Sequence, residues 1–214
     1  METAGESRQL TWREVVGKSA AFLASKGVPD SAVCAELLAA RLLGVGRGLL
    51  AGAFDRAAEE RHLAAMRRGM ARLARGEPLQ YVLGEWDFRT LTLKCDRRAL
   101  MPRAEAAGLV SLVLDWLRGA DRPAPPLVVD VGTGTGAIVL SLAKEYGGEA
   151  TFLGTDVSED AVALARENAE RCALSDRVGF AVMDGLDDFD EPQCVDAIVS
   201  NPPYIESAAV AALD

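Results

Sequence analysis

Residues 127–136 read Leu-Val-Val-Asp-Val-Gly-Thr-Gly-Thr-Gly, and this stretch decides the fold. Its first half is an apolar run broken by one acidic residue, which is typical of a strand buried on both faces of a sheet. Three glycines at alternate positions follow, and Ala137–Tyr146 then has the composition of a helix. Glycines permit positive φ and let a ligand approach the backbone, while the start of a helix presents free N–H groups. The order of strand, glycine turn and helix therefore predicts a ligand site of the dinucleotide-binding type.

The same alternation of strand and helix continues toward the C-terminus. The predicted strands are Leu127–Val131, Thr151–Thr155, Val178–Met183 and Val195–Ser200, with a helix at Glu159–Arg171. Strands separated by helices at this spacing form a parallel sheet, so we expect an α/β domain with a Rossmann-like fold. Asp156, Asp184 and Asn201 each follow a predicted strand. Such sheets bind ligands at the carboxyl ends of their strands, so these three residues are candidates for one site.

The residues ahead of the sheet have helical periodicity first and strand-like patterns later. We predict helices that begin at Thr11, at Asp30 and at Asp55, the third running through Arg75, and a loop or short turns between Gly44 and Gly52. Two strands of a β-hairpin, Gln80–Gly84 and Leu91–Cys95, and a helix at Glu105–Arg118 follow. These patterns suggest three parts: a small helical domain at 1–76, a β-hairpin linker at 77–103 and the sheet domain at 104–214.

The glycine loop and Asp156 together narrow the range of possible ligands. Asp156 lies 20 residues beyond Gly136, and a carboxylate at that strand end can accept hydrogen bonds from both hydroxyls of a ribose. Taken alone, the loop is also compatible with a purely structural turn, and loop plus carboxylate are compatible with an NAD site. The constellation resembles that of class I S-adenosylmethionine-dependent methyltransferases. The resemblance implies S-adenosyl-L-methionine as cofactor, no metal, and these cofactor-binding residues: Gly132, Thr133, Gly134, Thr135, Gly136, Asp156, Asp184, Gly185 and Asn201.

The segment Asn201-Pro202-Pro203-Tyr204 favours the methyltransferase interpretation. Two prolines remove two backbone donors, so the loop offers carbonyl acceptors, the Asn201 amide and the ring of Tyr204. A planar NH₂ group can donate to the Asn201 side-chain oxygen and the Pro202 carbonyl while Tyr204 stacks on its face. The segment resembles the N-P-P-Y motif of methyltransferases that modify planar amino groups. We therefore predict Asn201, Pro202 and Tyr204 as catalytic and all four residues as substrate-binding, although a rigid turn would use the same prolines.

Further motifs resemble one methyltransferase family. Gly76-Glu77-Pro78-Leu79-Gln80-Tyr81-Val82-Leu83-Gly84, Trp86-Asp87-Phe88 and Leu100-Met101-Pro102-Arg103-Ala104-Glu105 are similar to signatures of the peptide chain release factor glutamine N5-methyltransferases (HemK/PrmC type). This resemblance implies a helical N-terminal domain that helps recognise the release factor, a β-hairpin linker and a Rossmann-like class I methyltransferase domain. It implies methylation of the side-chain amide of the glutamine in the release factor's Gly-Gly-Gln motif.

The chain also departs from the family pattern. Ala104, Ala106 and Ala107 occur in the segment that resembles P-R-P-E-T-E, and two polar positions are thereby lost near the methionine end of the cofactor. Gly185 stands where an aromatic residue often follows the acidic residue of the third strand. The chain ends ten residues after Tyr204, and only four of the family's seven strands can be counted. We therefore expect a fragment whose Val195–Ser200 strand has a bare apolar edge, so that residues 1–214 alone aggregate, bind cofactor weakly and do not turn over.

The distribution of charge along the chain bears on the alternative functions. The net charge of −9 divides into +5 for residues 1–103 (17 basic, 12 acidic) and −14 for residues 104–214 (6 basic, 20 acidic). An acidic catalytic half argues against direct nucleic-acid binding, and so against a nucleic-acid amino methyltransferase. A non-catalytic cofactor- or partner-binding module is the third hypothesis.

No apolar run approaches the length of a membrane span. The four cysteines are far apart and form no C-x-x-C pair, so we expect reduced thiols and a cytoplasmic protein, or a matrix protein if a mitochondrial leader was removed.

Overall fold

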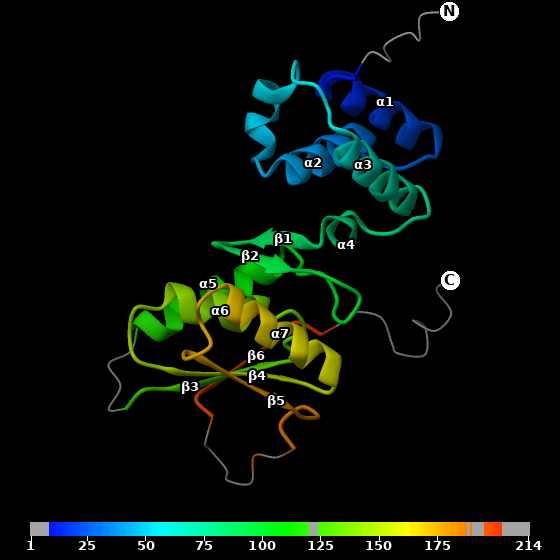
Figure 1. The fold of residues 1–214 in the computed structure, drawn as a ribbon. Helices are drawn as coiled ribbons and strands as arrows, with labels where there is room; N and C mark the ends of the chain where they lie inside the picture. Colours follow the sequence, from blue (N-terminus) through cyan, green and yellow to red (C-terminus); the bar gives the residue numbers. More distant parts are fainter. Residues whose placement is uncertain (1–8, 120–123, 188, 190–194, 203–214) are drawn as a thin grey trace, which may run out of the picture. The chain divides into compact units, whose positions relative to one another are not determined.

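The computed structural model describes residues 9–119, 124–187, 189 and 195–202 (Figure 1). The chain divides into two compact units, Met1–Gly84 and Glu85–Asp214. The division after Gly84 falls inside the segment 77–103. Our division of the chain at 76/77 and at 103/104 therefore stays a proposal.

The first unit is helical, as predicted. Its elements are α1 (Trp12–Ser25), α2 (Ser31–Leu43), the 3-10 helix η1 (Arg47–Ala53), α3 (Glu60–Leu73) and α4 (Leu79–Leu83). Thr11 and Glu14 form a reciprocal capping box at the start of α1, and Gly44 ends α2 with a positive φ of 66°. The largest buried side chains of this unit include Trp12, Leu23 and Leu50, which belong to one core cluster.

Three local predictions for this unit are wrong. The third helix begins at Glu60 rather than Asp55, because residues 56–58 pair with the start of the chain: the Ala58 N–H donates to the Leu10 carbonyl at 2.8 Å. Residues 80–84 are not a strand, because Pro78 begins the short helix α4 and Gly84, with a φ of 76°, ends it. The glycine-rich stretch after Gly44 contains the 3-10 helix η1 rather than turns alone.

The second unit contains the predicted parallel sheet. Its elements are β1 (Glu85–Phe88), β2 (Leu91–Lys94), α5 (Ala106–Gly119), β3 (Leu127–Val131), α6 (Ala137–Glu145), β4 (Thr151–Asp156), α7 (Glu159–Arg171), β5 (Val178–Val182) and β6 (Ala197–Ser200). Strands β1 and β2 form the hairpin, whose first strand begins five residues later than we predicted. Within the described residues the parallel sheet has the order β5-β4-β3-β6. This order places β3, with its glycine loop, between β4 and β6.

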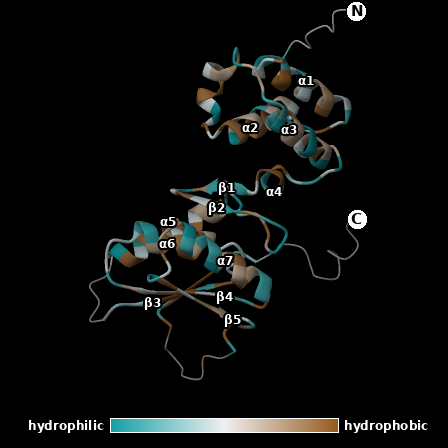
Figure 2. Ribbon diagram, in the orientation of Figure 1, coloured by the Kyte–Doolittle hydropathy of each residue, from teal (hydrophilic) through white to brown (hydrophobic). Residues whose placement is uncertain are grey.

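The core of the second unit lies between the sheet and the helices α5, α6 and α7, which lie on one side of the sheet in Figure 1. Phe88 and Leu93 of the hairpin belong to the same cluster of buried residues as Val128 and Phe152 of the sheet. Figure 2 shows that α7 carries many hydrophilic residues, whereas its buried residues are apolar except for Asn168. Among the residues placed by the structure, no helix has both the length and the apolarity to cross a bilayer.

Candidate functional site

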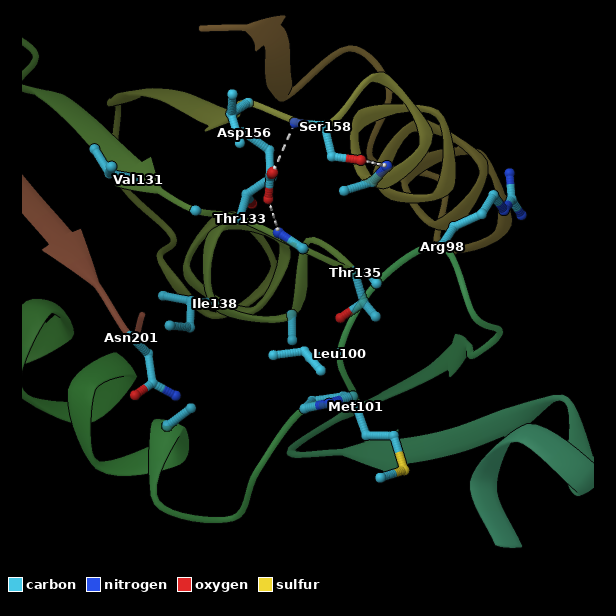
Figure 3. Close-up of a pocket in the computed structure, with 18 of the residues that line it drawn as sticks. Arg98, Leu100, Met101, Val131, Thr133, Thr135, Ile138, Asp156, Ser158 and Asn201 are labelled. Carbon is cyan, nitrogen blue, oxygen red and sulfur yellow. Dashed lines mark hydrogen bonds between the residues drawn. The ribbon is translucent and has the colours of Figure 1, made fainter. Parts of the chain in front are cut away.

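A cavity of about 480 Å³ opens at the carboxyl ends of the four parallel strands (Figure 3). Its volume falls in the range of small-molecule sites, about 300–1,000 Å³. One wall is the glycine loop, and the opposite wall is the irregular segment 98–103 that follows the hairpin. The cavity brings together these predicted residues: Gly132, Thr133, Gly134, Thr135, Asp156, Asp184, Gly185 and Asn201. Gly136 and Pro202 do not line it, and Pro203 and Tyr204 lie outside the described residues.

The glycine loop needs its glycines for backbone conformation. Gly132, Gly134 and Gly136 have φ values of 72°, 56° and 80°, in the left-handed region that side chains with a Cβ disfavour. The loop is tied to β4, because the Thr133 N–H donates to the Thr155 carbonyl at 2.8 Å. A Cβ on Gly132 would meet no atom within 4 Å, so its Cα faces open space. The backbone of the loop is therefore accessible to a ligand at this position.

An added methyl group is expected to lower stability more at Gly136 than at Gly132, the two outer glycines of the loop. A Cβ on Gly136 would lie 3.0 Å from Leu140 Cδ1 and 3.3 Å from Ala165 Cβ, and it would also strain the backbone. We expect Gly136→Ala to lower the unfolding free energy by about 2–4 kcal/mol, from backbone strain plus crowding. Gly132→Ala has only the backbone strain, about 1–2 kcal/mol. Thermal unfolding of both variants checks this order, and equal losses would contradict it.

Asp130 was not predicted as a site residue, yet it organises the loop. Its side chain is 1% exposed, and its Oδ2 accepts from Thr133 Oγ1 at 2.8 Å and from the Val139 N–H at 3.3 Å. It therefore caps the start of α6 from the end of β3, and it holds the loop between them. Burial raises the pKa of Asp130 to about 7, although the two hydrogen bonds oppose the shift and the Asp156 charge adds to it. The signal in the sequence was a lone acidic residue inside an apolar strand.

The raised pKa of Asp130 predicts a pH dependence of stability. Between its ordinary value of 3.8 and about 7, the folded protein keeps a proton on Asp130 that the unfolded chain releases. The contribution of Asp130 to the unfolding free energy therefore falls by about 2–4 kcal/mol in total as pH rises through that window. Above the window it is constant. An asparagine side chain in its place would accept the same two hydrogen bonds without titrating. We expect the difference in unfolding free energy between the wild type and Asp130→Asn to fall from pH 4 to pH 7. A difference that does not vary with pH would contradict the assignment.

Asp156 lies beside the glycine loop and faces the cavity (Figure 3). One carboxylate oxygen accepts from the Gly134 N–H and the other from the Ser158 N–H, each at 3.0 Å. Each oxygen has two lone pairs, so the carboxylate retains capacity for ligand hydroxyl groups. Asp156 thus joins the end of β4 to the loop and also offers acceptors to a ligand.

The β5 end and segment 98–103 supply the rest of the lining. Asp184 is exposed at the mouth, and Gly185 has a φ of 58° and accepts a hydrogen bond from Thr155 Oγ1 at 3.4 Å. Sequence reasoning missed the apolar side chains that line the cavity. Two of them, Leu100 and Val157, are 65% and 71% exposed. Leu100 lies in a segment that we noted for its family resemblance. Nothing in its own residue type marks it as lining a cavity.

Asn201 follows β6 on the other side of the glycine loop from Asp156, because β6 and β4 flank β3. Its half-buried side chain lines the cavity, and the end of its strand is held by Ser200 Oγ, which donates to the Val131 carbonyl at 2.8 Å. The site therefore has a carboxylate at one end and a side-chain amide at the other. Such a cavity can hold a ribose-containing ligand beside a second, hydrogen-bonding reactant.

Comparisons with known proteins agree with this geometry. Residues 14–84 match the PrmC N-terminal domain family, and residues 127–213 match a methyltransferase domain family. The release factor glutamine methyltransferase of Rhodopirellula baltica is 35% identical over 87% of this chain and 63% of its own length. That of Deinococcus radiodurans is 38% identical over 94% of this chain and 70% of its own length, and that of Chlorobaculum tepidum is 35% identical over 94% and 69%.

The chain thus spans roughly two thirds of the length of these curated relatives. The similarity covers both units, because it includes the helical unit that matches the PrmC N-terminal domain as well as the sheet that carries the cavity. The order of the parallel strands and the position of the glycine loop are those of a class I methyltransferase fold. The chain belongs to the release factor glutamine methyltransferase family.

Proposed function

We propose that the protein transfers a methyl group from S-adenosyl-L-methionine to the side-chain amide nitrogen (N5) of the glutamine in the Gly-Gly-Gln motif of a peptide chain release factor. The observation that carries this proposal is the placement of Asp156 and Asn201 on either side of one glycine loop, in one cavity. Family membership supports the choice of glutamine over a nucleic-acid base.

The residues of the cavity fit the cofactor. The open space at Gly132 leaves room for a ligand against the loop backbone, and Asp156 has acceptors for ribose hydroxyl groups. Residues 132–135 of the glycine loop and Asp156 would hold the cofactor, with Asp184 and Gly185 beside them. When bound, S-adenosylmethionine would supply a methyl group from its sulfonium sulfur, and breaking that C–S bond would leave the neutral thioether S-adenosylhomocysteine.

Asn201 and Pro202 are proposed to activate the substrate amide, which is a weak nucleophile. The lone pair of an amide nitrogen is delocalised into its carbonyl, and methylation requires this nitrogen to become pyramidal. In our proposal the Asn201 side-chain oxygen and the Pro202 carbonyl accept hydrogen bonds from the two N–H groups of the substrate amide. The two acceptors are placed to fit a pyramidal nitrogen, which favours the transition state over the planar amide. Pro203 and Tyr204 complete the substrate loop, with Tyr204 clamping the amide. The methylated nitrogen carries a strongly acidic proton that water can take, so no strong base is required.

The substrate also sets the partner and the compartment. We propose that the helical region 1–76 helps recognise the release factor, that 77–103 links it to the site, and that 104–214 carries out catalysis. A protein with this substrate works where translation terminates, in the cytoplasm or in the mitochondrial matrix.

Methyl transfer can be tested with labelled cofactor. The complete gene product is incubated with methyl-labelled S-adenosylmethionine and either a release factor, the same factor with the Gly-Gly-Gln glutamine replaced by alanine, or RNA. We expect label in the unaltered factor only, at that glutamine by mass spectrometry. Labelled RNA with an unlabelled factor would overturn the proposal. Tight cofactor binding without any transfer would favour a non-catalytic module.

A further inference from the structure

The wall of the cavity formed by residues 98–103 has no helix or strand of its own. An irregular segment keeps a defined position only where other groups bind its ends. The contacts of this part of the chain with α7 therefore help to set the shape of the cavity. Glu167 of α7 binds Arg98 of this segment directly, and the next residue, Asn168, binds Lys94, which ends β2 four residues before the segment.

Asn168 connects the end of β2, four residues before that segment, to the glycine loop. Its side chain is fully buried, and its Oδ1 accepts from the Lys94 N–H at 2.7 Å. Its Nδ2 donates to the Lys94 carbonyl at 3.1 Å and to the Thr135 carbonyl at 2.9 Å. One amide therefore binds both backbone groups of Lys94, which ends β2, and a carbonyl of the glycine loop, 41 residues further along the chain.

Only an amide of this length meets all three backbone groups. The site needs one acceptor and two donor hydrogens on a short side chain, which asparagine supplies. Aspartate retains the acceptor but sets a carboxylate against two carbonyls, and alanine leaves the half-buried N–H and carbonyl of Lys94 and the buried Thr135 carbonyl without this partner. Asn168 does not line the cavity, so its contacts act through Lys94 and Thr135.

Glu167 extends the same attachment on the outer side. Its carboxylate accepts from Lys94 Nζ at 2.6 Å and from both terminal nitrogens of Arg98 at 2.7 and 2.9 Å. Hydrogen bonds from Arg98 and Lys94 lower the pKa of Glu167 to about 2, so it is ionised at neutral pH. The side chain of Glu167 is 40% exposed, so solvent screens these pairs, and the buried amide of Asn168 is the stronger determinant.

We propose that Asn168 is a positioning residue of the cofactor cavity: by binding Lys94 and Thr135 together, it fixes the end of β2, from which the wall 98–103 continues, at a set distance from the glycine loop. The identity of the ligand rests on the proposed function, but the positioning does not. A site whose walls are about 1 Å too loose loses much of its binding and catalysis. Loss of Asn168 should therefore weaken ligand binding more than it weakens the fold.

The test compares Asn168→Ala with a variant that is destabilised elsewhere in the same core. Leu117→Ala serves as the control, because Leu117 is 2% exposed and lies on α5 about 16 Å along the helix from Ala106, which lines the cavity. The complete gene product is used, with S-adenosylhomocysteine as the calorimetric probe. Amide hydrogen exchange of Lys94 and of residues 132–139 is measured without ligand.

We expect Asn168→Ala to raise the Kd for the probe by about 5–20-fold and to speed exchange at Lys94 and in the loop at least tenfold. Leu117→Ala should lower the melting temperature by as much or more, yet leave Kd within twofold and exchange at Lys94 unchanged. Equal effects of the two variants on Kd, or a Kd within twofold for Asn168→Ala, would overturn the proposal. If Asn168→Ala does not fold, Asn168→Ser, which is uncharged and keeps a short polar side chain, decides by the same criteria.

The measurements also separate this inference from the proposed function. A wild-type protein that does not bind S-adenosylhomocysteine would contradict the proposed cofactor. The exchange rates at Lys94 and at residues 132–139 would then still decide whether Asn168 holds the two walls together. Unchanged exchange in both Asn168 variants would overturn the positioning role whatever the ligand is.

Discussion

Asn201→Ala is expected to lower kcat for methylation of the release factor by about 10²–10³-fold, the loss seen when one transition-state hydrogen-bond partner is removed. The Asn201 oxygen is proposed to bind an N–H of the substrate amide most strongly when the nitrogen is pyramidal. An interaction made mainly in the transition state affects kcat more than ground-state binding. Steady-state kinetics with a release factor and labelled cofactor, together with calorimetry for the cofactor, measure the two effects separately.

The control for Asn201 is Ile198→Ala on the same strand. Ile198 is 55% exposed on β6 and does not line the cavity, so its loss changes the strand surface without removing an acceptor. We expect kcat of this variant to stay within a few-fold of the wild type. Near-normal turnover of Asn201→Ala would show that the amide is not bound by Asn201. A comparable loss in Ile198→Ala would assign the effect to the strand instead.

The sheet was predictable because its strands carry their own signals. Each parallel strand is a short apolar run that ends at a glycine, an acidic residue or an asparagine, and the structure places β3 at Leu127–Val131 and α7 at Glu159–Arg171, as predicted. The site residues at the strand ends followed from the topology, since all carboxyl ends of a parallel sheet meet at one edge.

Predictions failed where distant partners decide the structure. Residues 56–58 resemble the first turn of a helix, but they pair with Leu10–Trp12 about 45 residues earlier, and that pairing delays α3. Asn168 occurs in a helix with ordinary propensity, and its partner Lys94 is 74 residues away. No local pattern marks such a contact, because the chemistry of a buried amide is defined by the backbone groups that the fold brings to it.

Asp130 falls between these two cases. An acidic residue inside an apolar strand is unusual enough to be noticed, because burying a charge without partners is costly. The sequence does not show that its partners are Thr133 and Val139, one on each side of Gly136. The glycine loop was therefore predicted as a ligand site, while the carboxylate that gives the loop its shape was not.

Asp156→Ala is expected to weaken binding of S-adenosylmethionine by about 1.5–3 kcal/mol, or roughly 10–150-fold in Kd, the range for hydrogen bonds to a charged group. Two losses contribute. The proposed bonds to the ribose hydroxyl groups disappear, and the N–H groups of Gly134 and Ser158 lose the acceptors that hold the loop against β4. Calorimetry of the complete gene product measures the change in Kd.

Asp156→Asn separates these two contributions. Asparagine keeps one side-chain oxygen that can accept from Gly134 or Ser158, but its NH₂ group cannot accept from the other. If the ribose contact dominates, the Kd of Asp156→Asn should lie between those of the wild type and Asp156→Ala, because one acceptor oxygen remains, and exchange at Gly134 should not follow Kd. If loop support dominates, exchange at Gly134 should rise in step with Kd in both variants. Unchanged affinity in Asp156→Ala would remove Asp156 from the site, and the cavity beside the glycine loop would then need another group to recognise a ribose.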